Sequence, residues 1–345
     1  MSRRAKLCWL LSLLVLLISM VLVGGVTRLT KSGLSITEWK PVTGLLPPLD
    51  EASWQREFNL YRESPEFKHQ NSHFLLEDYK GIFWWEYIHR VLGRVIFLVA
   101  SVMSFVFWRK AQWSGSRALV LPLLIAFQGL IGWLMVKTGL HQRPSVSHYM
   151  LTLHFLLALL TLTVVYHSLA KMKKPIFVSL SRVGRHLIWM MGLSLLLQIV
   201  YGCFTAGLKA GLYFNTFPLM NGVLLPDQAW DYEPWRRNWF ENPVLVQWFH
   251  RWLGILVGVF VPLGGVWLIK RESSEFLRPV LHLVSVVLVQ VVLGIANILL
   301  FVPTWLAVVH QFMALLIWLG FCNIVFRMRL TSLCGAGEFQ TKRTR

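Results

Sequence analysis

The chain has 345 residues, of which 55% are hydrophobic and 14% are charged, and its mean hydropathy is +0.55. These values exclude an ordinary soluble domain and are typical of membrane proteins with several spanning helices. The formal net charge of +18 would fit a nucleic-acid partner, but the basic residues gather in a few loops between apolar segments, so we expect no nucleic acid to bind.

Eight apolar segments follow one another along the chain, each about the length that a spanning helix needs, which is roughly 20 residues. They lie at about 7–27, 84–108, 118–137, 148–169, 186–207, 246–269, 279–301 and 304–326. The first is too long for the apolar part of a signal peptide, so we expect it to remain as a helix. The sequence therefore predicts an all-α polytopic membrane protein with eight transmembrane helices.

The basic residues predict how these helices are oriented. Lysines and arginines gather at the N-terminus, in the loops after the second, fourth and sixth segments, and in the tail. With eight helices these regions share one side, which the positive-inside rule assigns to the cytoplasm together with both termini. The long segments 28–83 and 208–245 then lie outside. We expect a bacterial inner membrane, because the start of the chain is too short for an organelle transit peptide.

The two halves of the chain repeat one pattern. EYIHRVLG at 86–93 matches QWFHRWLG at 247–254, and HFLLAL at 154–159 resembles HQFMAL at 310–315. Four single residues match as well: Gly24 with Gly202, Thr27 with Thr205, Gln128 with Gln290, and Gly132 with Gly294. Four helices separate the two copies, so both have one orientation in the membrane, which makes this a parallel repeat. We expect two four-helix bundles, at 1–170 and 171–330, followed by a cytoplasmic tail at 331–345.

Each half places two histidines near the outer ends of two different helices: His89 and His154 in the first half, and His250 and His310 in the second. Two imidazoles that face one another across a bundle core suit the axial positions of a haem iron. The alternative for any one of them is a packing role or an interhelical hydrogen bond. Four histidines at repeat-related positions favour ligands, so we predict one haem site in each half, near the periplasmic side.

Small and basic residues accompany these histidines. Gly93 and Gly254 each lie four residues after a histidine, where the absent side chain would let a flat macrocycle approach the helix. Arg90, Arg94 and Arg251 lie near the outer interface, where a guanidinium can bind a haem propionate through two hydrogen bonds. The alternative for these arginines is that they reach toward the outer lipid headgroups.

The repeat differs at one charged position. Glu86 lies three residues before His89 on the same helix face, whereas Gln247 holds the matching place in the second half. A carboxylate beside a haem ligand suits acid–base chemistry, and glutamine cannot exchange protons. We therefore predict the chemistry in the first half and electron storage in the second. The alternative is that Glu86 forms an interfacial ion pair with Arg90.

Four stretches of this sequence resemble the haem A synthase family: GGVTRLTKSGLSITEWKPVTGLLPPL (24–49), EYIHRVLGR (86–94), FNTFPLMNG (214–222) with Pro226, and QWFHRWLG (247–254). The resemblance covers all eight helices and both long outer segments, and it is to the mitochondrial and proteobacterial branch, whose outer loops lack cysteine pairs. It implies an oxidoreductase that acts on a CH group of haem O. The C8 methyl group would become a formyl group by successive hydroxylations, giving haem A for terminal oxidases.

The resemblance also implies roles for the site residues. His89 and His154 would hold haem O as the substrate, with Glu86 as the catalytic carboxylate, and His250 and His310 would hold one haem B as the cofactor. An external electron acceptor and a haem O synthase that hands over the insoluble substrate are expected partners. Helical membrane proteins also often self-associate in lipid, so a homo-oligomer is a further expectation.

Two other functions fit the same histidines. A di-haem b-type electron-transfer cytochrome needs no glutamate and would hold two permanent haems of one type. A transporter on the same repeat would use its histidines to relay protons and hold no haem. Residues of the first family motif either shape the substrate site or pack the outer loop: Thr27, Arg28, Glu38, Trp39 and Pro41.

Overall fold

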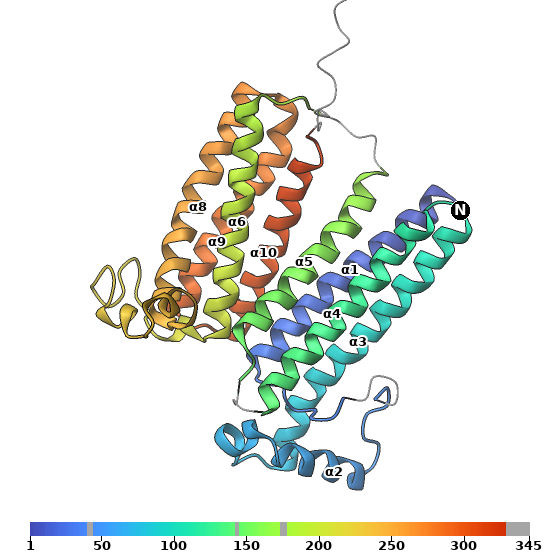
Figure 1. The fold of residues 1–345 in the computed structure, drawn as a ribbon, viewed down its shortest axis with the longest axis vertical. Helices are drawn as coiled ribbons and strands as arrows, with labels where there is room; N and C mark the ends of the chain where they lie inside the picture. The colour runs from blue at the N-terminus through green and yellow to red at the C-terminus, as the bar shows by residue number, and fades with distance from the viewer. Residues whose placement is uncertain (40–43, 142–144, 173–177, 329–345) are drawn as a thin grey trace, which may run out of the picture.

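The computed structural model describes residues 1–39, 44–141, 145–172 and 178–328 (Figure 1). The predicted tail at 331–345 and Pro41 of the first family motif lie outside these residues. Within them the chain is helical, and it forms two isolated β-bridges but no strand.

Eight long helices are apolar enough to cross a membrane, as the sequence predicted. They are α1 (Arg3–Leu29), α3 (Leu76–Arg109), α4 (Gly115–His141), α5 (His148–Ala170), α6 (Arg182–Gly207), α8 (Pro243–Arg271), α9 (Leu277–Leu299) and α10 (Thr304–Val325). Seven of them begin and end within a few residues of the predicted bounds. Their length follows from the apolar runs, because a helix satisfies every backbone polar group within its own segment.

The exception is α3, which begins at Leu76, whereas the sequence predicted a helix from about residue 84. Its first turn is capped by Asp78, whose Oδ2 accepts a hydrogen bond from the Leu75 N–H at 2.9 Å. The added turns bury Tyr79 and Phe83 against helix α2 (Glu51–Arg62), which the sequence did not predict. His89 is therefore 13 residues from the start of α3, further inside the helix than its predicted position near the helix end.

The long helices form two bundles that are inclined to each other in Figure 1. α1, α3, α4 and α5 share a core that includes Leu10, Met103 and Leu162. α6, α8, α9 and α10 share a second core that includes Ile188 and Val261. The bundles contact each other mainly through α1 and α5 on one side and α6 and α10 on the other. Side chains of the second bundle enter the first core there: Ile199, Cys203 and Leu315.

Both long connecting segments fold at the same end of the molecule (Figure 1). The first holds α2 and a π-helical turn, η1 (Phe67–Asn71). The second holds 3-10 turns η2 (Ala210–Leu212), η3 (Asp227–Trp230) and η4 (Trp235–Arg237), and the short helix α7 (Asn238–Glu241). A further 3-10 turn, η5 (Ser274–Phe276), precedes α9.

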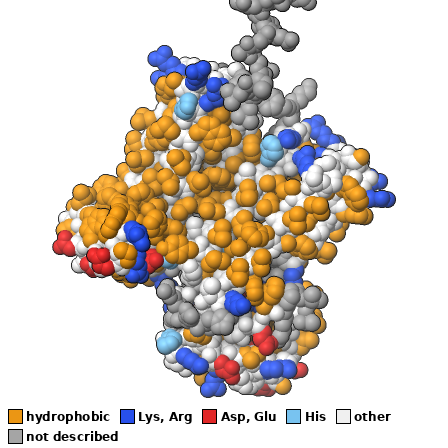
Figure 2. Space-filling model, in the orientation of Figure 1, with side chains coloured by type: hydrophobic (Ala, Val, Ile, Leu, Met, Phe, Trp, Pro, Cys, Tyr) orange, Lys and Arg blue, Asp and Glu red, His pale blue; other side chains and the backbone are white. Residues whose placement is uncertain are grey.

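The surface has a broad apolar middle. In Figure 2, hydrophobic side chains cover the sides of both bundles, and lysines and arginines gather at the end away from α2. Acidic side chains appear, together with further lysines and arginines, at the end that carries the two long segments. This distribution is the one that a membrane-spanning protein needs, with polar groups at both ends of an apolar belt. Which end faces the cytoplasm stays a prediction.

Candidate functional site

Each of the four histidines lies against a glycine of the neighbouring helix in its own bundle. In the first bundle, a Cβ on Gly24 of α1 would lie 2.8 Å from Cε1 of His89 on α3. The second bundle repeats this contact, because a Cβ on Gly202 of α6 would lie 3.1 Å from Cε1 of His250 on α8. A real Cβ does not tolerate such distances without a shift of its neighbour. The absence of a side chain at Gly24 and Gly202 therefore leaves the space that each imidazole occupies.

The other two histidines follow the same rule. A Cβ on Gly132 of α4 would lie 3.0 Å from Cε1 of His154 on α5, and a Cβ on Gly294 of α9 would lie 3.2 Å from Cε1 of His310 on α10. The sequence repeat pairs Gly132 with Gly294, but only the structure shows that each lies against a histidine. Each bundle thus holds two imidazoles, on different helices, each seated by a glycine.

The imidazoles themselves are unusual for membrane histidines with only a packing role. The Nδ1 atoms of His89, His154, His250 and His310 are all buried and without a hydrogen-bond partner among the described residues. Each histidine nevertheless keeps some accessible surface. The imidazoles of His89 and His154 are close enough to interact electrostatically, and so are those of His250 and His310. An unsatisfied buried imidazole is costly, so an interhelical hydrogen bond does not explain these four side chains.

The donor set decides what kind of group could bind. Among the described residues, no three or more of His, Cys, Asp and Glu come together as they would around a bare metal ion. A haem brings four equatorial nitrogens of its own and needs at most two protein ligands. The two imidazoles of each bundle therefore fit a haem.

Two glutamines support the helices that carry the histidines. Gln128 Nε2 donates to the backbone carbonyl of His154 at 2.8 Å, and Gln198 Nε2 donates to that of His250 at 3.2 Å. Gly93 and Gly254 face helices: a Cβ there would lie 3.3 Å from Met20 Cε and 3.0 Å from Gln198 Nε2. The close approach that these two glycines permit here is between helices, and their predicted contact with a macrocycle stays a prediction.

Glu86 is buried, with 3% of its surface exposed, and it accepts four hydrogen bonds. The Ser35 hydroxyl and the Ile36 N–H donate to its Oε2 at 2.7 and 2.8 Å. The Arg90 guanidinium donates to its Oε1 through Nη2 at 2.7 Å and Nε at 3.1 Å. Arg90 also donates to the carbonyls of Ile36 and Glu38. The ion pair with Arg90 is therefore present, and it fastens the loop that follows α1.

The second bundle fastens its own loop at the matching place. Gln247 Nε2 donates to the Phe214 carbonyl at 2.9 Å, and Arg251 Nη2 donates to the same oxygen at 3.3 Å. Arg251 Nη1 also donates to the carbonyls of Thr216, Pro218 and Leu219. Ile36 follows Gly24 by the same number of residues as Phe214 follows Gly202. The two bundles thus share one construction, with a carboxylate in the first and an amide in the second.

The three candidate arginines differ in how far other residues of the protein already occupy their donor atoms. Arg251 is 5% exposed, its Nε is buried without a partner, and no carboxylate lies within ion-pair distance of it among the described residues. Arg90 is engaged by Glu86. Arg94 lies one turn after Arg90 on α3 and is half-buried.

Three candidate residues of the first family motif contact other parts of the protein. Thr27 Oγ1 donates to the carbonyls of Val23 and Trp85. Arg28 Nη2 donates to the carbonyl of Ala206 in the second bundle. Trp39 stacks on Trp133 with 5.1 Å between ring centroids.

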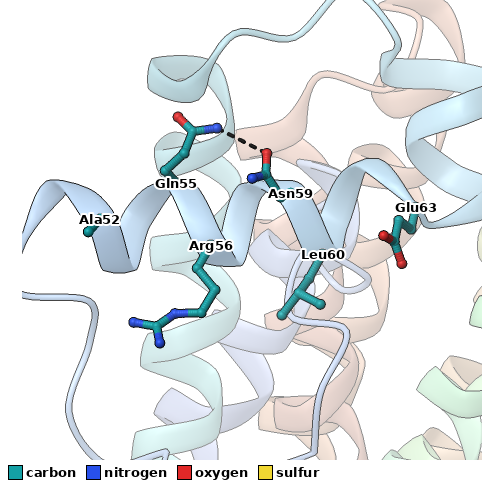
Figure 3. A pocket seen from close by; sticks show the side chains of 6 residues that line it. All are labelled: Ala52, Gln55, Arg56, Asn59, Leu60 and Glu63. Atoms are coloured by element: carbon teal, nitrogen blue, oxygen red, sulfur yellow. Dashed lines mark hydrogen bonds between the residues drawn. The ribbon is translucent and has the colours of Figure 1, made fainter.

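Two pockets lie away from the histidines. One, of about 450 Å³, is lined only by side chains of α2 (Figure 3): Ala52, Gln55, Arg56, Asn59, Leu60 and Glu63. The other, of about 690 Å³, is an apolar groove along α8 and Leu224. Neither contains one of the four histidines, so neither is the candidate site.

Comparisons with known proteins match this chain to a single family. Residues 7–322 match the model of a family described as cytochrome oxidase assembly protein. A heme A synthase of Brucella anthropi is 41% identical over 325 residues, which cover 92% of this chain and 90% of that protein. Heme A synthases of Brucella ovis and Brucella suis are 39% identical, over 92% of this chain and 89% of theirs.

Proposed function

Because the chain belongs to the haem A synthase family of cytochrome oxidase assembly proteins, we propose that it oxidises the C8 methyl group of haem O to a formyl group and so makes haem A. The observation that carries the proposal is the pair of glycine-seated histidines in each bundle, with a buried carboxylate three residues before a histidine in the first bundle alone. Two equivalent haem sites with one chemical difference suit one substrate and one resident cofactor.

The first bundle is assigned to the substrate and the second to the cofactor. His89 and His154 would hold the iron of haem O, and His250 and His310 would hold one haem B. When bound, haem B supplies one-electron redox chemistry. Arg251 has no carboxylate partner among the described residues, and a propionate would bind at its Nε, because its Nη atoms already donate to loop carbonyls. Arg90 positions Glu86 first, and Arg94 lies on the same helix one turn further on.

The overall reaction needs water and an oxidant. Two successive hydroxylations convert the methyl group and two water molecules to a geminal diol, with release of four protons and four electrons. The diol then loses one water molecule to give the aldehyde. The electrons would leave one at a time, through the second bundle, to an external electron acceptor.

The contacts of Glu86 suggest how it takes part. Four hydrogen bonds, two of them from the Arg90 guanidinium, fix the orientation of the Glu86 carboxylate. A fixed negative charge stabilises positive charge that develops on the methyl carbon as electrons leave, without any rearrangement of the protein. Glu86 therefore acts electrostatically, and proton acceptance would follow a loosening of its pair with Arg90.

Cellular setting and partners belong to the same proposal. The protein would lie in a bacterial inner membrane with both termini in the cytoplasm and both histidine pairs near the periplasmic side. Its substrate is insoluble in water, so a haem O synthase within the membrane is the expected supplier. Association with further copies of the chain is also expected.

Pigment analysis tests the proposal directly. The protein is purified from cells that make haem O, and its bound haems are extracted and identified by chromatography and mass. Haem B together with haem O, its hydroxylated derivative or haem A supports one resident cofactor and one processed substrate. Two molecules of haem B per chain, with no other haem, would instead identify a di-haem b-type electron-transfer cytochrome. A protein without haem would leave the transporter.

A further inference from the structure

Gln311 joins the two bundles at a place next to both pairs of histidines. It follows His310 on α10, and its Nε2 donates to the backbone carbonyl of Val21 on α1 at 2.7 Å. Other side chains also form hydrogen bonds between the two halves of the chain. Tyr149 Oη donates to Glu241 Oε1 at 3.3 Å, and Thr163 Oγ1 lies 3.8 Å from Cys322 Sγ. Trp318 Nε1 donates to Thr163 Oγ1 at 2.9 Å, and Arg28 donates to the Ala206 carbonyl. Of these side chains, Gln311 alone is the immediate neighbour of a candidate ligand.

The amide of Gln311 is seated on α1 by a glycine. A Cβ on Gly25 would lie 2.8 Å from Gln311 Oε1 and 2.9 Å from its Nε2, and Gly25 is buried. The residue before it is Gly24, which seats His89 of the first bundle. Two adjacent glycines of α1 therefore receive the imidazole of one bundle and the amide that reaches over from the other.

A continuous route results between the two candidate haem sites. It runs from His310 to Gln311 through the backbone, and from the Gln311 amide to α1 through the hydrogen bond to Val21 and the close contact with Gly25. From Gly25 it passes through the backbone to Gly24, which lies against the imidazole of His89. Electrons pass more readily through covalent and hydrogen bonds than through gaps of the same length. Every step of this route is a bond, a hydrogen bond or a close contact.

The link does not belong to the repeated four-helix unit. Phe155 holds the place after His154 in the first bundle, and it is an apolar residue packed against the first core. Cys203 follows Gly202, where the first bundle has Gly25 after Gly24. The repeat therefore supplies no second copy of the link, and its presence on one side only points to a role between the bundles.

We propose that Gln311 is a positioning residue that couples the two histidine sites, so that an electron passes between a haem bound at His89 and a haem bound at His310. The exchange is a one-electron step in which one iron is oxidised as the other is reduced. The inference rests on the proposed function for the presence of two haems, but it does not depend on the oxidation of the methyl group.

The test measures electron transfer inside the purified protein that carries both haems. One electron is delivered by a photoexcited dye, and its redistribution between the two haems is followed by absorption. For Gln311→Leu we expect the redistribution to slow by roughly fivefold or more, the scale on which one contact in a coupling network acts. Haem content and the midpoint potential of each haem should stay as in the unmodified protein, which separates lost coupling from a changed driving force.

Two further variants keep the inference falsifiable. In Gly25→Ala the new methyl group would clash with the side-chain amide of Gln311. This variant should therefore slow the electron redistribution, and it tests the inference even if Gln311→Leu does not fold. Trp318→Phe removes another hydrogen bond between the bundles and should leave the rate unchanged. Unchanged rates in both Gln311→Leu and Gly25→Ala would overturn the inference. So would an equal slowing in Trp318→Phe, because the effect would then be one of general packing. Pigment analysis of the same preparations reports separately on the proposed function.

Discussion

Glu86 and Gln247 bind equivalent loops of the two bundles through hydrogen bonds of opposite direction. Glu86 accepts from the backbone N–H of Ile36 at 2.8 Å, whereas Gln247 donates to the backbone carbonyl of Phe214 at 2.9 Å. The loop in the first bundle therefore presents donors to the side chain at position 86, and the loop in the second presents an acceptor to the side chain at position 247. A carboxylate and an amide are consequently not interchangeable at these two places.

Glu86→Gln should stop the reaction and leave the second bundle intact. All four groups that face the carboxylate are donors, so the amide nitrogen would meet a donor in either orientation. We expect a loss of about 1–3 kcal/mol of stability in the loop after α1. Haem O or its hydroxylated derivative should accumulate while haem B stays bound, as measured by extraction and mass.

Ser35→Ala is the matched control for that variant. It removes one hydrogen bond to Glu86 but keeps the negative charge and the pair with Arg90. We expect haem A to be made at close to the normal level. If Glu86→Gln also gave a normal yield of haem A, the catalytic assignment would be wrong and the ion pair with Arg90 would be structural.

Replacing the histidines should separate the two sites. His250→Ala or His310→Ala should reduce haem B content more than roughly tenfold, since even changes around a ligand cost that much affinity. His89→Ala or His154→Ala should leave haem B in place and remove haem O. The measurement is the haem content of the purified variants.

His282→Ala is the control for all four, because His282 also lies in a spanning helix with its ring near a glycine. A Cβ on Gly320 would lie 3.3 Å from its Cδ2. We expect both haems to remain. Loss of haem in His282→Ala as severe as in the four would show that any intramembrane histidine matters, and the ligand assignment would fail.

Eight spanning helices could be predicted because an apolar run of sufficient length has one stable state in lipid. The start of α3 could not, because Leu76 to Phe83 is not a continuous apolar run and its partners lie on α2. The four histidines were visible through the repeat, but the glycines that seat them lie on other helices. The contact of Gln311 with Val21 joins residues 290 positions apart, and no local pattern indicates it.

Gly132→Ala should weaken haem binding in the first bundle. The new methyl group would come 3.0 Å from His154 Cε1, so the imidazole must move. We expect a loss of about 1–3 kcal/mol from overpacking, only partly offset by the better helix propensity of alanine. The measurement is haem O content together with the absorption spectrum of the bound haems.

Gly129→Ala, one turn earlier on α4, is the control for that change. A Cβ at Gly129 meets no atom within 4 Å, so the substitution should be neutral or slightly stabilising. Equal haem content in Gly132→Ala and Gly129→Ala would mean that the glycine does not seat the imidazole.

The region around α2 should lose stability as the pH rises, because of Glu66. This residue is 4% exposed, and burial raises the pKa of its carboxyl to about 7 although the Tyr61 hydroxyl donates to it at 3.2 Å. The folded state therefore holds a proton that the unfolded state releases above about pH 4.5. Stability from this group is fully present below that pH and is lost as the pH rises to about 7, and the slope ends above it.

Glu66→Gln removes this titration and keeps an acceptor for Tyr61. At pH 8 the variant should be more stable than the unmodified protein by about 3 kcal/mol at most, and at pH 4 the two should be alike. The measurement is the apparent melting temperature of the solubilised protein across this range. Glu63→Gln, an exposed carboxylate at the end of α2, should leave the profile unchanged. A profile that keeps its slope in Glu66→Gln would place the titrating group elsewhere in the molecule.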